Sequence, residues 1–391
     1  MGEQFDRAVS LQELTKAVRQ CAKGVSWKDG VCSASLHAMT FAKRLRDDLL
    51  HGRYKLRKGT LVQIYRPKRR EALAPWFRDR VWQRSICNNG VYDDLTRDLL
   101  PESFACQKGK GTDQAIRCVI QMLQRLHRER PGAPIYGVHL DIKKYFPSTP
   151  HIEIIRRDEQ IITEPLFLPY LSEIVDSYDD HRTEAEITAD PFGKRGTGLG
   201  IQINQLHQIS LLNDLDHELK QLCRDMERYN DDILMLSHDR EIVEIGRGIT
   251  DARLAEKGLI MTDKSGVFKA QNGFYFLRKR FLITDTGKIV IRLHKRAMSE
   301  ERHVLRCLAE AVKAGERTML DVQKHYQSWI AQAEYCGDAA IQEMDKYYTG
   351  LFRQRPKYKR KRRYLYGKPV KKSKAYQPGL GTGKCTAPQE P

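Results

Sequence analysis

The segment MERYNDDILMLS, residues 226–237, constrains the fold more than any other part of this sequence. Short apolar runs flank an Asn-Asp pair, which is the pattern of two strands joined by a tight turn. We therefore expect a β-hairpin with Asp231 at its tip and Asp232 directly after it. A chain with this hairpin must contain an antiparallel sheet at this point.

A second acidic residue stands at the end of another expected strand. An apolar, partly β-branched run covers residues 135–140 and ends at Asp141, and Pro147 and Pro150 then break the pattern. This arrangement predicts a strand that runs into a turn. Asp141 is therefore expected at a strand end.

Three carboxylates at strand ends and turns suggest metal-dependent phosphate chemistry. Transfer of a nucleotidyl group uses two divalent cations about 3.5–4 Å apart, and Mg²⁺ prefers carboxylate ligands. An Asp-Asp pair alone is weak support, because such pairs also occur at residues 47–48, 93–94 and 179–180. Side chains alternate along a strand, so we expect Asp141 and Asp231 to be the main ligands and Asp232 a weaker one.

Helical spacing appears in two later regions. Apolar residues recur at three- and four-residue steps from Gln205 to Leu222, which predicts one amphipathic helix after the glycines at positions 196, 198 and 200. Beyond His294 the sequence reads as helical segments through Phe352. The C-terminal part is therefore expected to be a helical domain with a basic tail.

The charge of the chain favours a polyanionic partner. The formal net charge is +18 with a pI near 9.4, and residues 352–376 hold twelve Lys or Arg and no acid. Cations that neutralise phosphates release condensed counterions, so nucleic acid is the expected partner. A solvated, purely solubilising tail is the alternative, and the basic stretch 44–70 is a second candidate for the nucleic-acid site.

Composition also excludes some classes of protein. No stretch of about 18 apolar residues is present, which argues against a membrane span, and no signal peptide is expected. Nine cysteines are scattered without a Cys-x-x-Cys pair, which argues against a zinc site and a disulfide framework. We expect a cytoplasmic protein with reduced thiols.

Five segments, taken in order across roughly residues 66–293, resemble motifs of bacterial retroelement-type reverse transcriptases. This family includes the enzymes of retrons, group II introns and diversity-generating retroelements. The similar segments are RPKRREALAPWFRDRV, SFACQKGKGTDQA, HLDIKKYFPST, TGLGIQINQLHQISLLNDLDH and LIMTDKSGV, and YNDD resembles the Y-x-D-D signature. Each segment alone is weak evidence of similarity, but five segments in the family's order are not readily explained by chance.

The resemblance implies an α+β, right-hand polymerase fold with an antiparallel palm sheet. The implied domains are fingers over residues 1–135, a palm with an inserted fingers segment over 136–290, a helical thumb over 291–351 and a basic, flexible tail over 352–391. The cofactor it implies is Mg²⁺, as two ions held by the three aspartates, with Mn²⁺ as a substitute.

The same resemblance suggests roles for residues around the nucleotide. Lys68 and Arg70 would hold the triphosphate, because these cations form charge-assisted contacts with phosphate. Phe146 would exclude a ribose 2′-hydroxyl and so select deoxynucleotides. An exposed basic face and an ordinary core aromatic are the competing interpretations.

Four further positions carry implied roles. Gly200 would let the backbone approach the nucleotide or template closely, and Gln205 would start the helix beneath it. Lys264 would protonate the pyrophosphate leaving group as a general acid. Tyr229 would pack against the primer end, with strand core as the alternative.

The function implied is RNA-directed DNA synthesis. Its expected partners are an RNA template, in particular a structured non-coding RNA, the DNA product, deoxynucleoside triphosphates, and a protein partner or second copy of the chain. The sequence departs from the family at Gly198, at Asn204-Gln205 and at Arg278, which stands where the family usually has a glycine. The departures at Asn204 and Arg278 favour an antiphage defence enzyme. The alternatives are a diversity-generating retroelement enzyme, a template-independent or protein-primed polymerase, and a non-catalytic nucleic-acid-binding scaffold.

Overall fold

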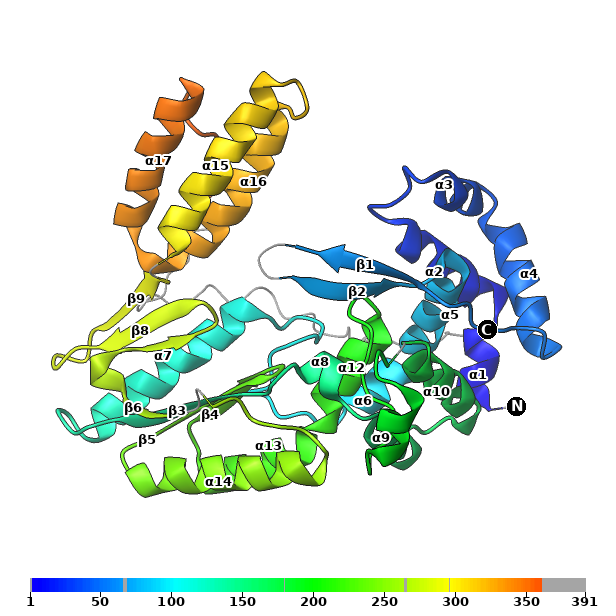
Figure 1. Ribbon diagram of the computed structural model, residues 1–391, viewed down its shortest axis with the longest axis horizontal. Helices are drawn as coiled ribbons and strands as arrows, with labels where there is room; N and C mark the ends of the chain where they lie inside the picture. The colour runs from blue at the N-terminus through cyan, green and yellow to red at the C-terminus, as the bar shows by residue number, and fades with distance from the viewer. Residues whose placement is uncertain (1, 66–68, 179, 264–265, 295, 361–391) are drawn as a thin grey trace, which may run out of the picture. The chain divides into compact units, whose positions relative to one another are not determined.

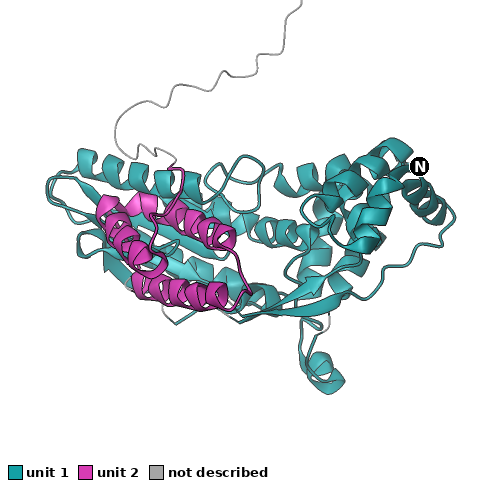
Figure 2. Cartoon of the chain, turned by 90° about the horizontal axis from the view of Figure 1, so that it is seen from above, with its two compact units in different colours: residues 1–290 teal, residues 291–391 magenta. Residues whose placement is uncertain are grey.

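The computed structural model describes residues 2–65, 69–178, 180–263, 266–294 and 296–360, and it divides the chain into two compact units. The first unit covers residues 1–290 and the second residues 291–391 (Figure 2). The fold is mixed α+β, as the sequence predicts. No helix within the described ranges is long and apolar enough to cross a membrane.

The first unit begins with helices that gather around an aromatic core. Phe5 and Trp82 meet edge to face with ring centroids 6.0 Å apart, and Phe167 lies 6.5 Å from Trp82. The Ser10 side chain accepts from the Glu13 backbone N–H, which fixes the start of the second helix. These helices are α1 (Glu3–Ala8), α2 (Leu11–Ala22), α3 (Asp29–Leu36), α4 (Ala38–Leu50), α5 (Phe77–Ile86), the π-helical η1 (Cys87–Val91) and α6 (Tyr92–Thr96).

A two-stranded antiparallel hairpin follows α4 in the sequence. It consists of β1 (Thr60–Ile64) and β2 (Arg70–Ala74). The Leu73 backbone N–H donates to the Leu199 carbonyl at 2.7 Å, so β2 also pairs with the glycine-rich segment. A Cβ at Gly198 would lie 2.6 Å from the Leu73 Cβ, which explains why a glycine stands there.

The central sheet has four strands in the order β4-β5-β3-β6, and each neighbouring pair is antiparallel. One face of the sheet carries Val138 and Leu140, which share a core with Val243 and Leu254 of α14. In Figure 1, α13 and α14 lie on one side of this sheet and α7 on the other. The elements are β3 (Tyr136–Asp141), β4 (Met226–Tyr229), β5 (Asp232–Ser237), β6 (Val267–Lys269), α7 (Thr112–Glu129), α13 (Asn213–Leu222) and α14 (Arg240–Glu256).

The helix predicted from Gln205 to Leu222 is two helices rather than one. Helix α12 begins at Gln202 and ends at Leu211, and Leu212 leaves helical geometry with φ −100° and ψ 10° before α13 begins. The apolar spacing continues through this break although the apolar residues of α12 and α13 enter different cores: Ile203, Leu206 and Ile209 pack with the N-terminal helices, and Leu215 and Leu219 pack under the central sheet. The remaining helices between β3 and α12 are α8 (Tyr145–Ser148), α9 (His151–Ile161), the 3₁₀ turn η2 (Pro165–Phe167), α10 (Leu168–Asp176) and α11 (Glu184–Ala189).

A second, three-stranded sheet follows in the order β7-β8-β9. Its strands are β7 (Phe274–Phe276), β8 (Lys279–Ile283) and β9 (Ile289–Leu293), preceded by the 3₁₀ turn η3 (Ala270–Asn272). Leu277 and Arg278 join β7 to β8 with φ of +47° and +63°. Two positive φ values are the pattern of a type I′ turn, which favours Asn and Gly. Arg278 therefore adopts a left-handed conformation that glycine would adopt more easily.

Three long helices make up the second unit. They are α15 (Ala297–Lys313), α16 (Met319–Ala333) and α17 (Asp338–Phe352), with the 3₁₀ turn η4 (Glu334–Cys336) between the last two. Leu305, Tyr326, Ile330 and Met344 are buried in their shared core. The predicted helical domain after His294 is thus present. Residues 353–360, expected to be part of a flexible tail, instead pack against these helices.

Candidate functional site

The predicted hairpin of residues 226–237 is present and carries two aspartates. Strands β4 and β5 pair up to Tyr229 and Asp232, which leaves Asn230 and Asp231 as the two-residue turn. Asn230 has φ +60°, a left-handed conformation that asparagine tolerates better than most residues. The sequence therefore placed Asp231 correctly at the hairpin tip.

Asp141 and Asp232 lie directly opposite each other in the central sheet. They are partners in the antiparallel register of β3 and β5. Opposite residues point to the same face, with Cα atoms roughly 4.5–5.5 Å apart. The alternation from which Asp232 was expected to be the weaker ligand does not apply here, because Asp231 lies in the turn and regular alternation begins only at Asp232.

Asp231 lies close enough to both other carboxylates to feel their charge. Burial raises the pKa of the Asp231 carboxyl, and the neighbouring charges of Asp232 and Asp141 raise it further. The Asn230 side-chain amide donates to Asp231 at 3.0 Å and opposes this effect. The structure therefore pairs Asp141 with Asp232 and places Asp231 within electrostatic range of both.

His139 is a neighbour of this site that the sequence reasoning did not identify. Its Nε2 lies 2.7 Å from Oδ1 of Asp232, and its ring meets Phe276 edge to face at 5.5 Å. His139 shares a sheet face with Asp141 because the two residues are two positions apart on one strand. We call the surface formed by His139, Asp141 and Asp232 the carboxylate face.

The carboxylate face suits a hard divalent cation in its chemistry. Asp141 and Asp232 on this face and Asp231 in the adjoining turn supply oxygen donors, which Mg²⁺ prefers. Burial, and then the charges of Asp232 and Asp141, raise the pKa of Asp231, and a cation would offset both effects. Across the part of the chain that the structure describes, no three acidic, histidine or cysteine side chains are already gathered as a metal-binding cluster. Asp232 is paired with His139 and Asp231 accepts from Asn230 instead.

A buried ion pair supports the turn that carries Asp231. Arg228 and Asp216 are each 1% exposed, and the guanidinium binds the carboxylate through Nε at 2.7 Å and Nη2 at 2.6 Å. Arg228 also donates to the carbonyls of Asn230 at 3.0 Å and Ile209 at 2.7 Å. Arg228 and Asp216 therefore hold the Asn230–Asp231 turn in place, and they lie on the face of the sheet opposite the carboxylates. Sequence reasoning did not identify either residue.

The glycine-rich segment is tied to the turn that contains Phe146. The Thr197 backbone N–H donates to the Phe146 carbonyl at 2.9 Å, and Gly196 donates to Thr149 at 2.8 Å. Phe146 is half-buried and lies edge to face with Tyr145. A Cβ at Gly200, where φ is +102°, would lie 3.0 Å from the Leu73 carbonyl oxygen. Gly200 thus permits a close approach of the β1–β2 hairpin.

The other predicted residues occupy varied positions. Arg70 is exposed at the start of β2, and Gln205 is half-buried within the first turns of α12 rather than at its start. Tyr229 ends β4, half-buried, and its hydroxyl accepts from Thr112 at 3.3 Å. Lys68 and Lys264 lie outside the described residues.

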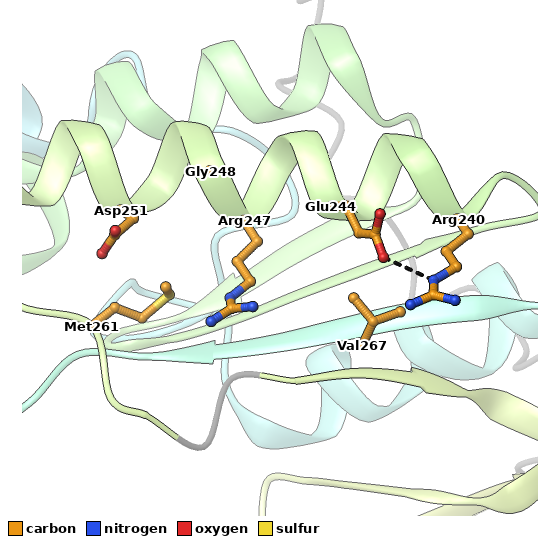
Figure 3. Close-up of a pocket in the computed structure, with 7 residues that line it drawn as sticks. All are labelled: Arg240, Glu244, Arg247, Gly248, Asp251, Met261 and Val267. Atoms are coloured by element: carbon orange, nitrogen blue, oxygen red, sulfur yellow. Dashed lines mark hydrogen bonds and ion pairs between the residues drawn. The ribbon is translucent and has the colours of Figure 1, made fainter.

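One open pocket lies away from the carboxylates. It is lined by Arg240, Glu244, Arg247, Gly248, Asp251, Met261 and Val267, and its volume is about 480 Å³. Figure 3 shows Arg240, Glu244 and Arg247 projecting from α14, with Arg240 paired to Glu244 at 2.8 Å. Helix α14 packs on the sheet face opposite the carboxylates, so this pocket is separate from the candidate site.

Two telomerases are among the solved structures that are similar to this chain. One is telomerase from Candida albicans in complex with a fragment of telomeric RNA, with TM-score 0.47 and 12% identity over 80% of this chain and 58% of that chain. The other is apo telomerase from Candida tropicalis, with TM-score 0.44 and 11% identity over 59% of this chain and 54% of that chain. This chain spans just over half the length of each. No protein-family model and no curated protein matches it.

Proposed function

We propose that this protein is an RNA-directed DNA polymerase that uses two-metal nucleotidyl transfer. The observation that carries the proposal is the pairing of Asp141 opposite Asp232 with Asp231 in the adjoining turn. Carboxylates that converge from two strands and a turn form the kind of site on which two metal ions can be held during attack of a 3′-hydroxyl.

Asp141, Asp231 and Asp232 would hold two Mg²⁺ ions, with Mn²⁺ as a substitute. Bound there, the ions supply Lewis-acid stabilisation of the attacking hydroxyl and the triphosphate. Asp232 would exchange its contact with His139, and Asp231 its contact with Asn230, when they act as ligands. Arg228 would hold the turn in place during this exchange through its bond to the Asn230 carbonyl.

The nucleotide would lie between the carboxylate face and the β1–β2 hairpin. Arg70 is exposed on that hairpin and free to contact phosphate, which supports its proposed role with Lys68. Phe146 would select deoxynucleotides, and Gly200 and Gln205 would line the site from the segment bound to β2. Lys264 is proposed as the general acid and Tyr229 as the contact with the primer end.

These assignments correspond to a right-hand polymerase with the central sheet as its palm. The helices around β1 and β2 would be fingers, and the three-helix second unit would be the thumb. The net charge of +18 supports an RNA template and a DNA product as partners. The departures at Asn204 and Arg278 favour an antiphage defence enzyme that copies a cognate non-coding RNA, with a diversity-generating retroelement enzyme as the alternative.

Primer extension tests the proposed activity. Purified protein is given a DNA primer on a defined RNA template with deoxynucleotides and Mg²⁺, and the product is sequenced. We expect a DNA copy of the template, and none when Asp141 is replaced by Asn. A product whose sequence ignores the template would favour the template-independent alternative, and no Asp141-dependent product on any primer would favour the scaffold.

A further inference from the structure

A short basic segment follows α17 and folds back on the second unit. We call residues 353–360 the strap; it contains five Lys or Arg and no acid. Arg353 ends α17 in the left-handed conformation with φ +51°, and its N–H donates to the Thr349 carbonyl at 2.9 Å. The strap thus starts with a sharp reversal of the chain.

Two groups of contacts fix the strap to α16 and α17. The Tyr358 hydroxyl donates to Asp345 Oδ2 at 2.7 Å, while Tyr326 donates to the other oxygen of the same carboxylate at 2.7 Å. The rings of Tyr326 and Tyr358 lie 5.8 Å apart. The Gln327 side-chain amide donates to the Lys359 carbonyl at 2.9 Å and accepts from the Lys359 N–H at 2.7 Å. These contacts hold the backbone of the strap in one position.

The cations of the strap point away from the helices. Arg355, Lys357 and Lys359 are exposed and alternate with the half-buried Pro356 and Tyr358. Within the described ranges the side-chain charges of these three residues have no hydrogen-bond or ion-pair partner, although the Lys359 backbone is bound by Gln327. In an extended chain alternate residues are about 6.6 Å apart, which is comparable with the spacing of neighbouring phosphates on one nucleic-acid strand.

Some other cations of the same unit are paired with acids. Lys313 pairs with Glu310 at 2.9 Å, Arg302 binds Glu343, and Arg360 at the end of the strap binds Asp338. The three alternating cations differ from these because no carboxylate neutralises them. Their charge therefore remains available to a ligand from solution.

We propose that the strap binds the phosphate backbone of a single RNA strand through Arg355, Lys357 and Lys359. This inference rests on the proposed function in one respect, because an RNA-templated enzyme must hold RNA. The anchored backbone reduces the conformational entropy that binding costs, and each phosphate contact releases counterions. An extended segment with cations along one edge follows one strand, which favours single-stranded RNA.

The test removes the three charges in the full-length protein. The variant Arg355→Gln, Lys357→Gln, Lys359→Gln is titrated with a short single-stranded RNA of mixed sequence at several salt concentrations. We expect the slope of log affinity against log salt to become shallower by about 2, since each single-strand phosphate contact contributes about 0.7. When salt rises from roughly 50 to 200 mM, the triple variant should therefore lose roughly 16-fold less affinity than wild type loses.

A matched control removes the same charge from the same unit. Lys313→Gln, Arg317→Gln, Lys324→Gln replaces one cation paired with Glu310 and two whose charges lower the pKa of Asp321. We expect this control to retain nearly the wild-type slope. Equal changes in the two triple variants, or an unchanged slope in the strap variant, would overturn the proposal.

A second variant tests the anchoring without any change of charge. Tyr358→Ala removes the contacts with Asp345 and Tyr326, so its affinity for RNA should fall. Tyr358→Phe keeps the ring, so its affinity for RNA should fall less. Single-stranded DNA of the same sequence bound with the same strap dependence and equal affinity would overturn the assignment to RNA. Primer extension is measured in parallel to separate the two proposals. Strap-dependent RNA binding by a protein that does not extend a primer would refute the proposed polymerase function and leave the proposed role of the strap intact.

Discussion

Replacing Asp216 by Asn should destabilise the first unit far more than the same replacement of its exposed neighbour Asp214. The change keeps the shape of the side chain but leaves the Arg228 guanidinium, 1% exposed, without a countercharge. Removing one partner of a buried ion pair costs about 3–5 kcal/mol, a large part of the roughly 5–15 kcal/mol that stabilises a domain. Urea unfolding measured by circular dichroism and tryptophan fluorescence should show a much lower midpoint.

Asp214→Asn is the matched control for this experiment. Asp214 lies two residues away on the same helix, its side chain is 68% exposed, and its contact with Arg157 is 3.4 Å long. A surface ion pair contributes about 0–1 kcal/mol, so this variant should unfold close to wild type. Equal unfolding midpoints for the two variants would refute the structural role of the pair.

The double variant Asp216→Leu, Arg228→Met separates stability from activity. Apolar residues of similar volume often replace a buried ion pair at little or no cost in stability. The Asn230 carbonyl nevertheless loses its charged donor, a bond worth about 1.5–3 kcal/mol. We expect recovered stability with deoxynucleotide incorporation slower by roughly ten- to hundred-fold. Wild-type incorporation in a stable double variant would show that Arg228 does not position the Asp231 turn.

Three further predictions concern other parts of the first unit. Phe146→Ala should admit ribonucleotides in primer extension, and unchanged discrimination against them would show that Phe146 is not the selective residue. Burial raises the pKa of Glu227 well above its usual range, so the folded state favours the neutral acid. Wild type should therefore lose stability relative to Glu227→Gln as pH rises from about 4.3, and a pH-independent difference in unfolding free energy would contradict this. Leu277→Asn with Arg278→Gly should stabilise the β7–β8 turn by about 1 kcal/mol, and a lower melting temperature would contradict the type I′ assignment.

The hairpin and the strand before Asp141 could be predicted from sequence because their signals are local. An Asn-Asp pair between apolar runs favours a tight turn through the local chemistry of these two residues. The relation of Asp232 to Asp141 could not be predicted in the same way, because it depends on the register of β5 against β3. The break at Leu212 was also hidden, since apolar spacing continues across it.

The supporting residues were missed for a different reason. Arg228 and Asp216 are charged residues that usually lie at the surface, and only the packed structure shows that they neutralise each other. A signal existed in retrospect, because Asp216 stands at a helical position between Leu215 and Leu219 on the apolar side. His139 carried a similar signal, two residues before Asp141 on one strand.

The central claim is that the three aspartates form a metal-dependent catalytic site. The most direct test measures Mg²⁺-dependent incorporation of a single deoxynucleotide by wild type and by Asp231→Ala, Asp232→Ala, with circular dichroism and RNA binding as controls for folding. We predict that the double variant folds and binds RNA but incorporates no nucleotide above background. Incorporation at the wild-type rate by the folded double variant would contradict the claim.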